Sequence, residues 1–235
     1  MKITLAQISV AASIQLNLQK IIKIIQEHKT NNLIIFPELA LTSYNLEYIT
    51  SLNQQIIDEA LDKIQLQLSS HDQTVIVGTS RYNNEGNIYN SAAIITTQNI
   101  LYYDKINLTK KDRSLFTPGK KMQTVDIESY RIGTIICRDQ NDIELIQNYK
   151  KRKIDVMVQL SAHYYETEIS LKKIDKNIAM PIARAIDCSC TWIKVNTVGQ
   201  FENEMSLGNS MIVSPIGEVL RQGNKFTEEI ITFTT

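Results

Sequence analysis

The sequence predicts a layered α/β fold in which helices cover mixed β-sheets, and three observations support this prediction. Short segments rich in β-branched residues alternate with longer segments whose apolar residues recur at helical spacing. Hairpin signals interrupt this alternation, which argues against a simple doubly wound sheet. The 235 residues, 43% of them hydrophobic, are enough for a sizeable core, and we expect one domain spanning 1–235.

In the first half of the chain, strands alternate with two amphipathic helices. Short β-branched or alternating runs predict strands at 2–8, 32–36, 74–80, 88–96 and 100–105. Apolar residues at helical spacing predict helices at 13–28 and 52–69. The stretch RYNNEGN between the third and fourth strands is rich in Asn and Gly, so these two strands are expected to form a hairpin.

The second half repeats this alternation after a polar loop at 106–121. Strands are expected at 122–127, 131–137, 155–160, 190–196 and 208–214, and the turn SPIGEV then leads to a final strand. Helices are expected near 140–151 and 170–187. The sequence contains no internal repeat, low-complexity segment or linker, which favours a single domain.

Composition and charge argue against several classes of function. Lys plus Arg and Asp plus Glu number 25 each, so no net field favours nucleic acid or an anionic membrane. The N-terminus lacks a signal peptide's apolar core, and no apolar stretch approaches the roughly 20 residues that span a bilayer. Three cysteines give no disulfide framework, which is typical of the cytoplasm. Cys188 and Cys190 are interpreted as small buried residues rather than metal ligands.

Three chemically active side chains stand where predicted strands end. Glu38 follows IIFP, Lys105 follows LYYD, and Cys137 follows IGTII. Strand ends at one edge of a sheet are where α/β folds gather active sites. Each residue also has an ordinary interpretation: Glu38 as a carboxylate at a helix N-terminus, Lys105 as a surface charge, and Cys137 as a core thiol.

The surroundings of Cys137 predict a strand-to-helix turn. The polar residues from Asp139 to Asp142 follow the apolar strand and are suited to accept hydrogen bonds from the free N–H groups of a helix start. Such a turn holds a nucleophile at the edge of the sheet with helix N–H groups nearby.

Four segments resemble, in order, the nitrilase superfamily of carbon–nitrogen hydrolases: FPELALTSYNLE (36–47), YDKINL (103–108), LFTPGK (115–120) and IGTIICRD (132–139). Two later segments, ARAIDCSCTWIKVNTVG and GNSMIVSPIGEVL, are similar to its later strand-and-turn elements, so the resemblance covers nearly the whole chain. It implies an α-β-β-α sandwich, usually paired into a homodimer. It also implies cleavage of a non-peptide C–N bond in a small amide or carbamoyl compound.

The resemblance further implies a role for each residue. A free thiol has a pKa of about 8.5 and is mostly protonated at neutral pH, so a carboxylate base, Glu38, would take the proton of Cys137. Lys105 and the backbone N–H of Arg138 would offset charge on the tetrahedral intermediate. No metal or organic cofactor is implied. By analogy His163, after QLSA, lines the pocket, although a lone histidine could equally be structural.

The sequence departs from the family pattern near the expected pocket. Asp112 stands where the family commonly has a second glutamate, and the alternative is a plain surface aspartate. Asn107 stands where a histidine is often found, NDIEL replaces a segment similar to FPE, and Arg138 follows the cysteine. Arg138 would either hold a substrate carboxylate or pair with Asp139 or Asp142. These changes affect the expected substrate more than the expected reaction.

Several hypotheses for the function follow. The leading one is a cytoplasmic thiol amidase that acts on a small amide through an acyl-enzyme. An acyltransferase with the same Glu-Lys-Cys set, or a catalytically weakened binding protein on the same fold, is the alternative. The segment FPELALTSY is also similar to the glutaminase part of glutamine-dependent NAD synthetases, but we expect a lone amidase because 235 residues leave no room for a synthetase domain. The sequence lacks the G-x-S-x-G motif of a serine hydrolase.

Overall fold

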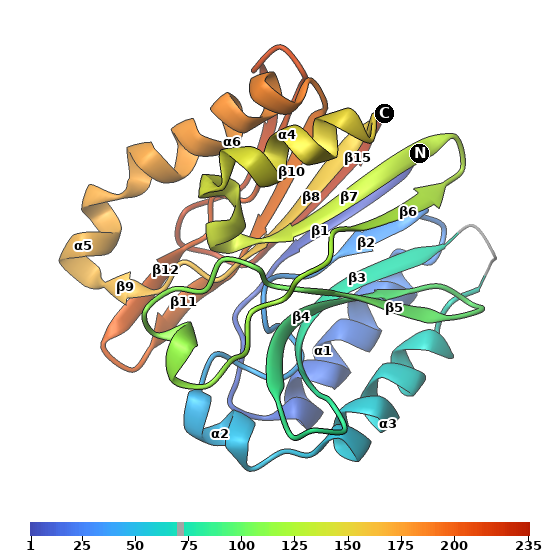
Figure 1. The fold of residues 1–235 in the computed structure, drawn as a ribbon, viewed down its shortest axis with the longest axis vertical. Coiled ribbons are helices and arrows are strands. Elements are labelled where there is room, and N and C mark those ends of the chain that lie inside the picture. Colours follow the sequence, from blue (N-terminus) through green and yellow to red (C-terminus); the bar gives the residue numbers. More distant parts are fainter. Residues whose placement is uncertain (70–72) are drawn as a thin grey trace.

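The computed structural model describes residues 1–69 and 73–235, and their helices and strands form four layers (Figure 1). Two six-stranded sheets pack face to face in the middle. Helices α1 (Ile14–Glu27) and α3 (Gln54–Gln65) cover the outer face of the first sheet, and α4 (Ile143–Lys151) and α6 (Ile174–Cys188) cover the second. This is the α-β-β-α sandwich that the sequence resemblance implied.

The first sheet combines parallel strands with a hairpin. Its order is β15 (Glu229–Thr234), β1 (Lys2–Gln7), β2 (Leu33–Ile35), β3 (Thr74–Tyr82), β4 (Ile88–Ile95) and β5 (Ile100–Asp104). β1, β2 and β3 run parallel, whereas β3 and β4 form the expected antiparallel hairpin. The short helix α2 (Leu46–Thr50) follows β2.

The second sheet has three parallel strands at its centre. Its order is β14 (Val219–Gln222), β13 (Met211–Val213), β10 (Thr191–Asn196), β8 (Val156–Ser161), β7 (Tyr130–Ile136) and β6 (Gln123–Ile127). β7, β8 and β10 are parallel, and β8 lies between the other two. A small third sheet joins β11 (Val198–Phe201), β12 (Glu204–Leu207) and β9 (Tyr165–Glu166) beside α5 (Thr167–Lys172).

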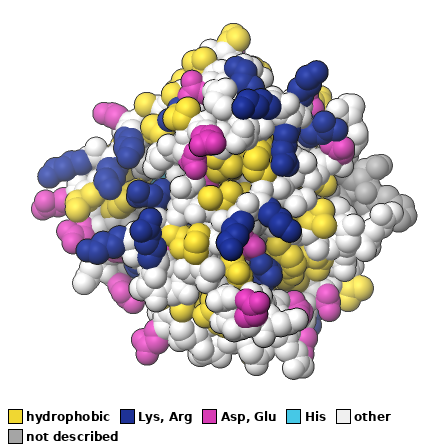
Figure 2. Space-filling model, viewed as in Figure 1, with side chains coloured by type: hydrophobic (Ala, Val, Ile, Leu, Met, Phe, Trp, Pro, Cys, Tyr) yellow, Lys and Arg dark blue, Asp and Glu magenta, His cyan; other side chains and the backbone are white. Residues whose placement is uncertain are grey.

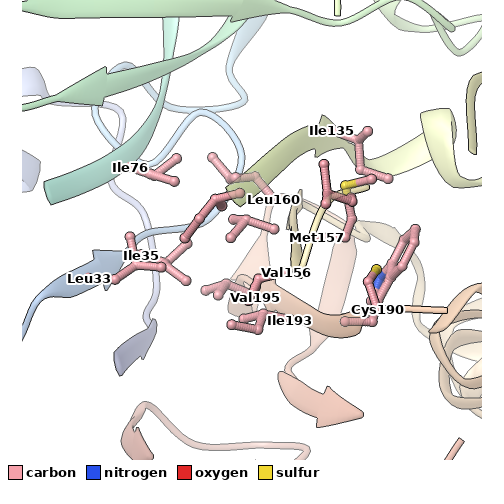
Figure 3. Packing of buried hydrophobic residues seen from close by; sticks show 14 of the residues in the cluster. Leu33, Ile35, Ile76, Ile135, Val156, Met157, Leu160, Cys190, Ile193 and Val195 are labelled. Atoms are coloured by element: carbon pink, nitrogen blue, oxygen red, sulfur yellow. The ribbon is translucent and has the colours of Figure 1, made fainter. Parts of the chain in front are cut away.

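Alternating side chains of the second sheet divide between two apolar layers. Leu160 and Val195 face Ile35 and Ile76 across the space between the sheets, whereas Met157 points to the opposite face (Figure 3). The neighbours of Val195 on β10 therefore lie on the face that α6 covers. Cys188 and Cys190, exposed by only 2% and 1%, are buried as predicted.

The structure corrects several expectations about the elements. The helix expected near 170–187 is divided at Lys173 into α5 and α6, and the expected final strand is two strands, β14 and β15. The small third sheet was not predicted, because strands of two to four residues are too short to show a period. Within 1–69 and 73–235, no helix combines the length and the apolar character needed to cross a membrane. Figure 2 shows basic, acidic and apolar side chains scattered over one face.

Candidate active site

Glu38 is a buried carboxylate with a polar partner on each oxygen. It follows β2 and Pro37 and is only 1% exposed. Its Oε1 accepts hydrogen bonds from Lys105 Nζ at 2.6 Å and from the Asn90 side-chain amide at 2.8 Å. Its Oε2 accepts the backbone N–H of Ala162, after β8, at 2.9 Å. Glu38 therefore links the two sheets at their strand ends.

Gly78 on β3 allows the loop that carries Glu38 to lie against the sheet. A Cβ atom at this position would lie 2.3 Å from both Leu39 N and Pro37 O, closer than any real contact allows. The Gly78 N–H donates to the Pro37 carbonyl at 3.1 Å, and Leu39 has a φ of 52°. The close approach of the two backbones fixes the position of the carboxylate.

Lys105 is held by its backbone as well as by its side chain. Its N–H donates to the Asn90 carbonyl and its own carbonyl accepts the Gly119 N–H, both at 2.8 Å. A Cβ atom on Gly119 would lie 2.0 Å from the Asp104 carbonyl oxygen, so only glycine fits against the end of β5. The segment LFTPGK therefore packs beside Lys105, while Lys105 Nζ lies between Glu38 and Asp112.

Asp112 is fully buried, so its interpretation as a surface aspartate is wrong. Its Oδ2 lies 2.8 Å from Lys105 Nζ and accepts the Thr109 N–H at 2.9 Å. Its Oδ1 accepts the Tyr44 hydroxyl at 2.8 Å. A short 3₁₀ helix, Asp112–Ser114, brings the backbone close to the lysine, which explains how the shorter carboxylate reaches it.

Cys137 occupies the predicted turn, which begins as a 3₁₀ helix over Cys137–Asn141. Its φ of 45° lies in the left-handed region that non-glycine residues rarely adopt. The buried Asp139 carboxylate holds the turn. It accepts the Ile136 N–H at 3.0 Å, the Asn107 N–H at 2.7 Å and the Tyr103 hydroxyl at 2.7 Å.

Cys137 and Glu38 share a neighbour. The Ala162 N–H that donates to Glu38 also lowers the pKa of the Cys137 thiol, whereas the charge of Glu38 raises it. From β8, the Gln159 side-chain amide donates to the Cys137 carbonyl at 3.4 Å. The structure thus brings together Glu38, Lys105, Asp112 and Cys137, which lie in four separate segments of the sequence.

The electrostatics of this cluster keep the thiol protonated beside an ion pair. Burial, followed by the Glu38 charge, raises the pKa of the Cys137 thiol. Burial also raises the pKa of Glu38, although Lys105 opposes this shift. Burial alone would lower the pKa of Lys105, but its anionic neighbours raise that pKa well above the usual range. Burial would likewise raise the pKa of Asp112, yet Lys105 and its hydrogen bonds lower it.

The two other expected pocket residues differ in exposure. The Arg138 side chain is exposed, and it pairs with neither Asp139 nor Asp142. Asp142 instead accepts the Asn107 side-chain amide at 3.0 Å and caps α4. His163 is 5% exposed, and its N–H donates to the Asn196 side chain at 3.0 Å.

Sequence reasoning missed several residues that build the site. Asn90 and Lys194 are polar side chains inside the apolar strand segments IYNSAAII and TWIKVN. A polar residue in such a segment could have indicated a buried functional group. Asp139 was expected at a helix start or as a partner of Arg138, whereas it accepts hydrogen bonds from the Ile136 N–H, the Asn107 N–H and the Tyr103 hydroxyl. Nothing local to Tyr44 indicates that its hydroxyl reaches Asp112.

An α-β-β-α sandwich that gathers a carboxylate, a lysine and a cysteine at its strand ends defines the class of carbon–nitrogen hydrolases. The model of the family Carbon-nitrogen hydrolase matches residues 2–234. The chain belongs to this family.

Individual relatives agree with this placement. The chain is 27% identical over 238 residues to a glutamine-dependent NAD(+) synthetase of Acinetobacter baylyi, a match over 97% of this chain and 43% of that protein. The chain thus spans less than half the length of this relative. It is 24% identical to a human omega-amidase, over 99% of this chain and 87% of the relative. A cysteine-to-alanine mutant of the amidase from Nesterenkonia sp. AN1, in complex with butyramide, superposes with a TM-score of 0.86 at 18% identity, over 99% of this chain and 89% of that one.

Proposed function

We propose that this protein is a thiol amidohydrolase that cleaves the C–N bond of a small linear amide through a cysteine acyl-enzyme. One observation carries the proposal: the end of β8 holds both residues, since the Ala162 N–H donates to the Glu38 carboxylate and the Gln159 side-chain amide donates to the Cys137 carbonyl. A carboxylate base and a thiol nucleophile are therefore neighbours, and a lysine stands on the other oxygen of the same carboxylate.

In the first half of the proposed reaction, Glu38 takes the thiol proton as Cys137 Sγ forms a bond to the amide carbon. A base in contact with the thiol is needed because the raised pKa of Cys137 keeps it protonated at neutral pH. Collapse of the tetrahedral intermediate breaks the C–N bond, and Glu38 passes its proton to the departing nitrogen. The product of this half is a thioester plus ammonia or an amine.

In the second half, water attacks the thioester carbon while Glu38 accepts one of its protons. The C–S bond breaks, the acid leaves, and the proton returns to Cys137. The oxyanion of both tetrahedral intermediates would face Lys105 and the Arg138 N–H. That N–H lies in the first turn of the 3₁₀ helix, where no intrahelical acceptor is available to it.

The residues around this set support hydrolysis of a primary amide. Asp112 and Tyr44 hold Lys105, and Asp139 holds the turn of Cys137. The contacts that position the reactive side chains are thus present, and a binding protein without catalytic activity would not need them. The names of two relatives specify glutamine and omega-amides, which supports a terminal amide that releases ammonia.

A screen of small amides and carbamoyl compounds, scored by ammonia release, tests the proposal. We expect turnover by the unmodified protein and none by Cys137→Ala. Iodoacetamide should inactivate the protein and label Cys137 before Cys188 or Cys190, since those two are almost completely buried. Full activity in Cys137→Ala would refute the thiol mechanism.

We also propose that the protein is cytoplasmic and that it forms a homodimer, the second of which the family resemblance implies. Three free cysteines are compatible with a reducing compartment. Light scattering on the purified protein should give the mass of two chains of 26.8 kDa each. The mass of a single chain at working concentrations would contradict the homodimer.

A further inference from the structure

Lys194 on β10 is a buried basic side chain without a counter-ion. It is fully buried, and its Nζ donates to the Asn177 carbonyl of α6 at 2.8 Å. It forms no ion pair with a carboxylate of residues 1–69 or 73–235. An ammonium group has three N–H donors, and an uncompensated charge in the interior is strongly destabilising. Such a group is suited to bind an anion.

The sheet places Lys194 on the same side as the site. Lys194 is in register with Gln159 of β8, and Gln159 donates to the Cys137 carbonyl. Because β8 separates β10 from β7, Lys194 and the end of β7 are two strand spacings apart, roughly 10 Å. The side chains of Lys194 and Cys137 shorten this distance between backbones, so a small molecule of a few carbon atoms is long enough to reach both.

His163 provides a second group with unused hydrogen-bonding capacity in the same place. Its backbone N–H bonds Asn196, which is two residues after Lys194 and on the same face of β10. Its imidazole Nδ1 is buried and has no hydrogen-bond partner among the described residues. Burial, followed by Lys194, Lys105, Lys173 and Lys176, holds the pKa of His163 well below its usual range. The charges acting on this neutral imidazole are therefore cationic.

We propose that Lys194 and His163 form a subsite for the free carboxylate of the substrate, whose amide group lies at Cys137. This inference rests on the proposed amidohydrolase function and names its substrate class: the monoamide of a dicarboxylic acid. Hydrolysis adds one water, breaks the C–N bond and yields ammonia and the dicarboxylate. The buried Lys194, rather than the exposed Arg138, holds the second carboxylate, because burial strengthens a charged hydrogen bond that solvent would otherwise weaken.

A pair of substrates that differ only at the far end tests this subsite. Glutaramate carries a carboxylate where pentanamide carries a methyl group. We expect the unmodified protein to prefer glutaramate in kcat/KM, and Lys194→Met to reduce that preference roughly tenfold to a hundredfold, the effect of a lost charged hydrogen bond. The control is Lys63→Met, which removes an exposed lysine of α3 on the outer face of the first sheet. This variant should keep the preference for glutaramate.

A binding measurement separates this inference from the proposed function. Calorimetry should show glutarate binding to Cys137→Ala, and at least tenfold weaker binding when Lys194→Met is added. Glutarate binding without turnover of any amide would leave the subsite standing and refute the hydrolase. Equal kcat/KM for glutaramate and pentanamide in the unmodified protein would refute the subsite. This comparison needs no variant, so it holds even if Lys194→Met does not fold. Equal losses for both substrates in a folded Lys194→Met would also refute it.

Discussion

At the scale of single residues, Asp112 should act by positioning Lys105. Asp112→Asn keeps the shape but removes the charge that lies 2.8 Å from the lysine. We expect kcat to fall roughly tenfold to a hundredfold with little change in KM, because the loss affects the transition state more than substrate binding. Asp126→Asn, an exposed aspartate paired with Arg131, is the matched control. A wild-type kcat in Asp112→Asn would show that the contact is only structural.

The acidity of Glu38 predicts the pH dependence of the reaction. As a general base Glu38 must be ionised, and burial raises its pKa above 4.5, so kcat/KM should fall as the pH falls through this raised value. The charge of Asp112 also raises the pKa of Glu38, so Asp112→Asn should move the acidic limb of the profile to lower pH. Profiles of both proteins measured from about pH 4 to 8 check the direction. A shift to higher pH would contradict this assignment of the limb.

Most of the residues that contact and position the reactive side chains could not be predicted from the sequence. Glu38, Lys105 and Cys137 were indicated by their places at strand ends, which are local features. The contacts that join them are not local: Ala162 reaches Glu38 from the other sheet, and Tyr44 reaches Asp112 from a distant loop. Such contacts depend on how the two sheets pack, which no periodicity in the chain records.

At the scale of elements, the close packing of β3 against the loop of Glu38 predicts the effect of one methyl group. Gly78→Ala would place a Cβ 2.3 Å from two backbone atoms, so the loop must move. We expect a destabilisation of about 1–3 kcal/mol, as for other overpacked sites, together with a large loss of kcat. Thermal unfolding and turnover of the variant measure the two effects.

Gly86→Ala is the control for this substitution. Gly86 lies in the β3–β4 turn at a φ of 80°, and a Cβ there would have no neighbour within 4 Å. Its substitution should cost about 1 kcal/mol of stability through the backbone conformation alone and leave kcat unchanged. Wild-type turnover in Gly78→Ala would show that the loop tolerates the displacement.

The elements themselves were largely predictable, because long strands and helices carry their own periodicity. α1, α3, β1 and the β3–β4 hairpin lie close to their expected positions. The expected helix near 140–151 is α4, but a 3₁₀ turn precedes it because the Asp139 side chain bonds back to the Ile136 N–H. The order of the strands within the sheets, by contrast, follows from packing over the whole chain.

At the scale of the whole molecule, Lys194 should make stability depend on pH. Burial lowers its pKa from 10.5 to about 7. The unfolded chain therefore holds a proton that the folded protein has lost between about pH 7 and 10.5. The cost in folding free energy of burying the charged Lys194 is therefore complete below pH 7, and it shrinks as the pH rises from about 7 to 10.5.

Lys194→Met removes this penalty. We expect Tm to rise by several degrees at about pH 6 and by less at about pH 9, since each kcal/mol shifts Tm by about 2–4 °C in a protein of this size. The residues facing Lys194 are the neutral His163, the Cys137 thiol and the Asn177 carbonyl, which remain in both proteins. Calorimetric scans at the two pH values measure the difference, and an equal gain at both would contradict it.

The pairing of β1 with β15 has a consequence for how the chain is made. Lys2 is in register with Thr234 and Gln7 with Glu229, so β1 leaves the ribosome long before the strand that covers its edge. Until then β1 has one unsatisfied row of backbone hydrogen-bonding groups, and contacts of such long sequence separation form slowly. During synthesis this edge is open to strands of other nascent chains. Pairing with β15 therefore covers this edge and removes a site at which nascent chains can aggregate.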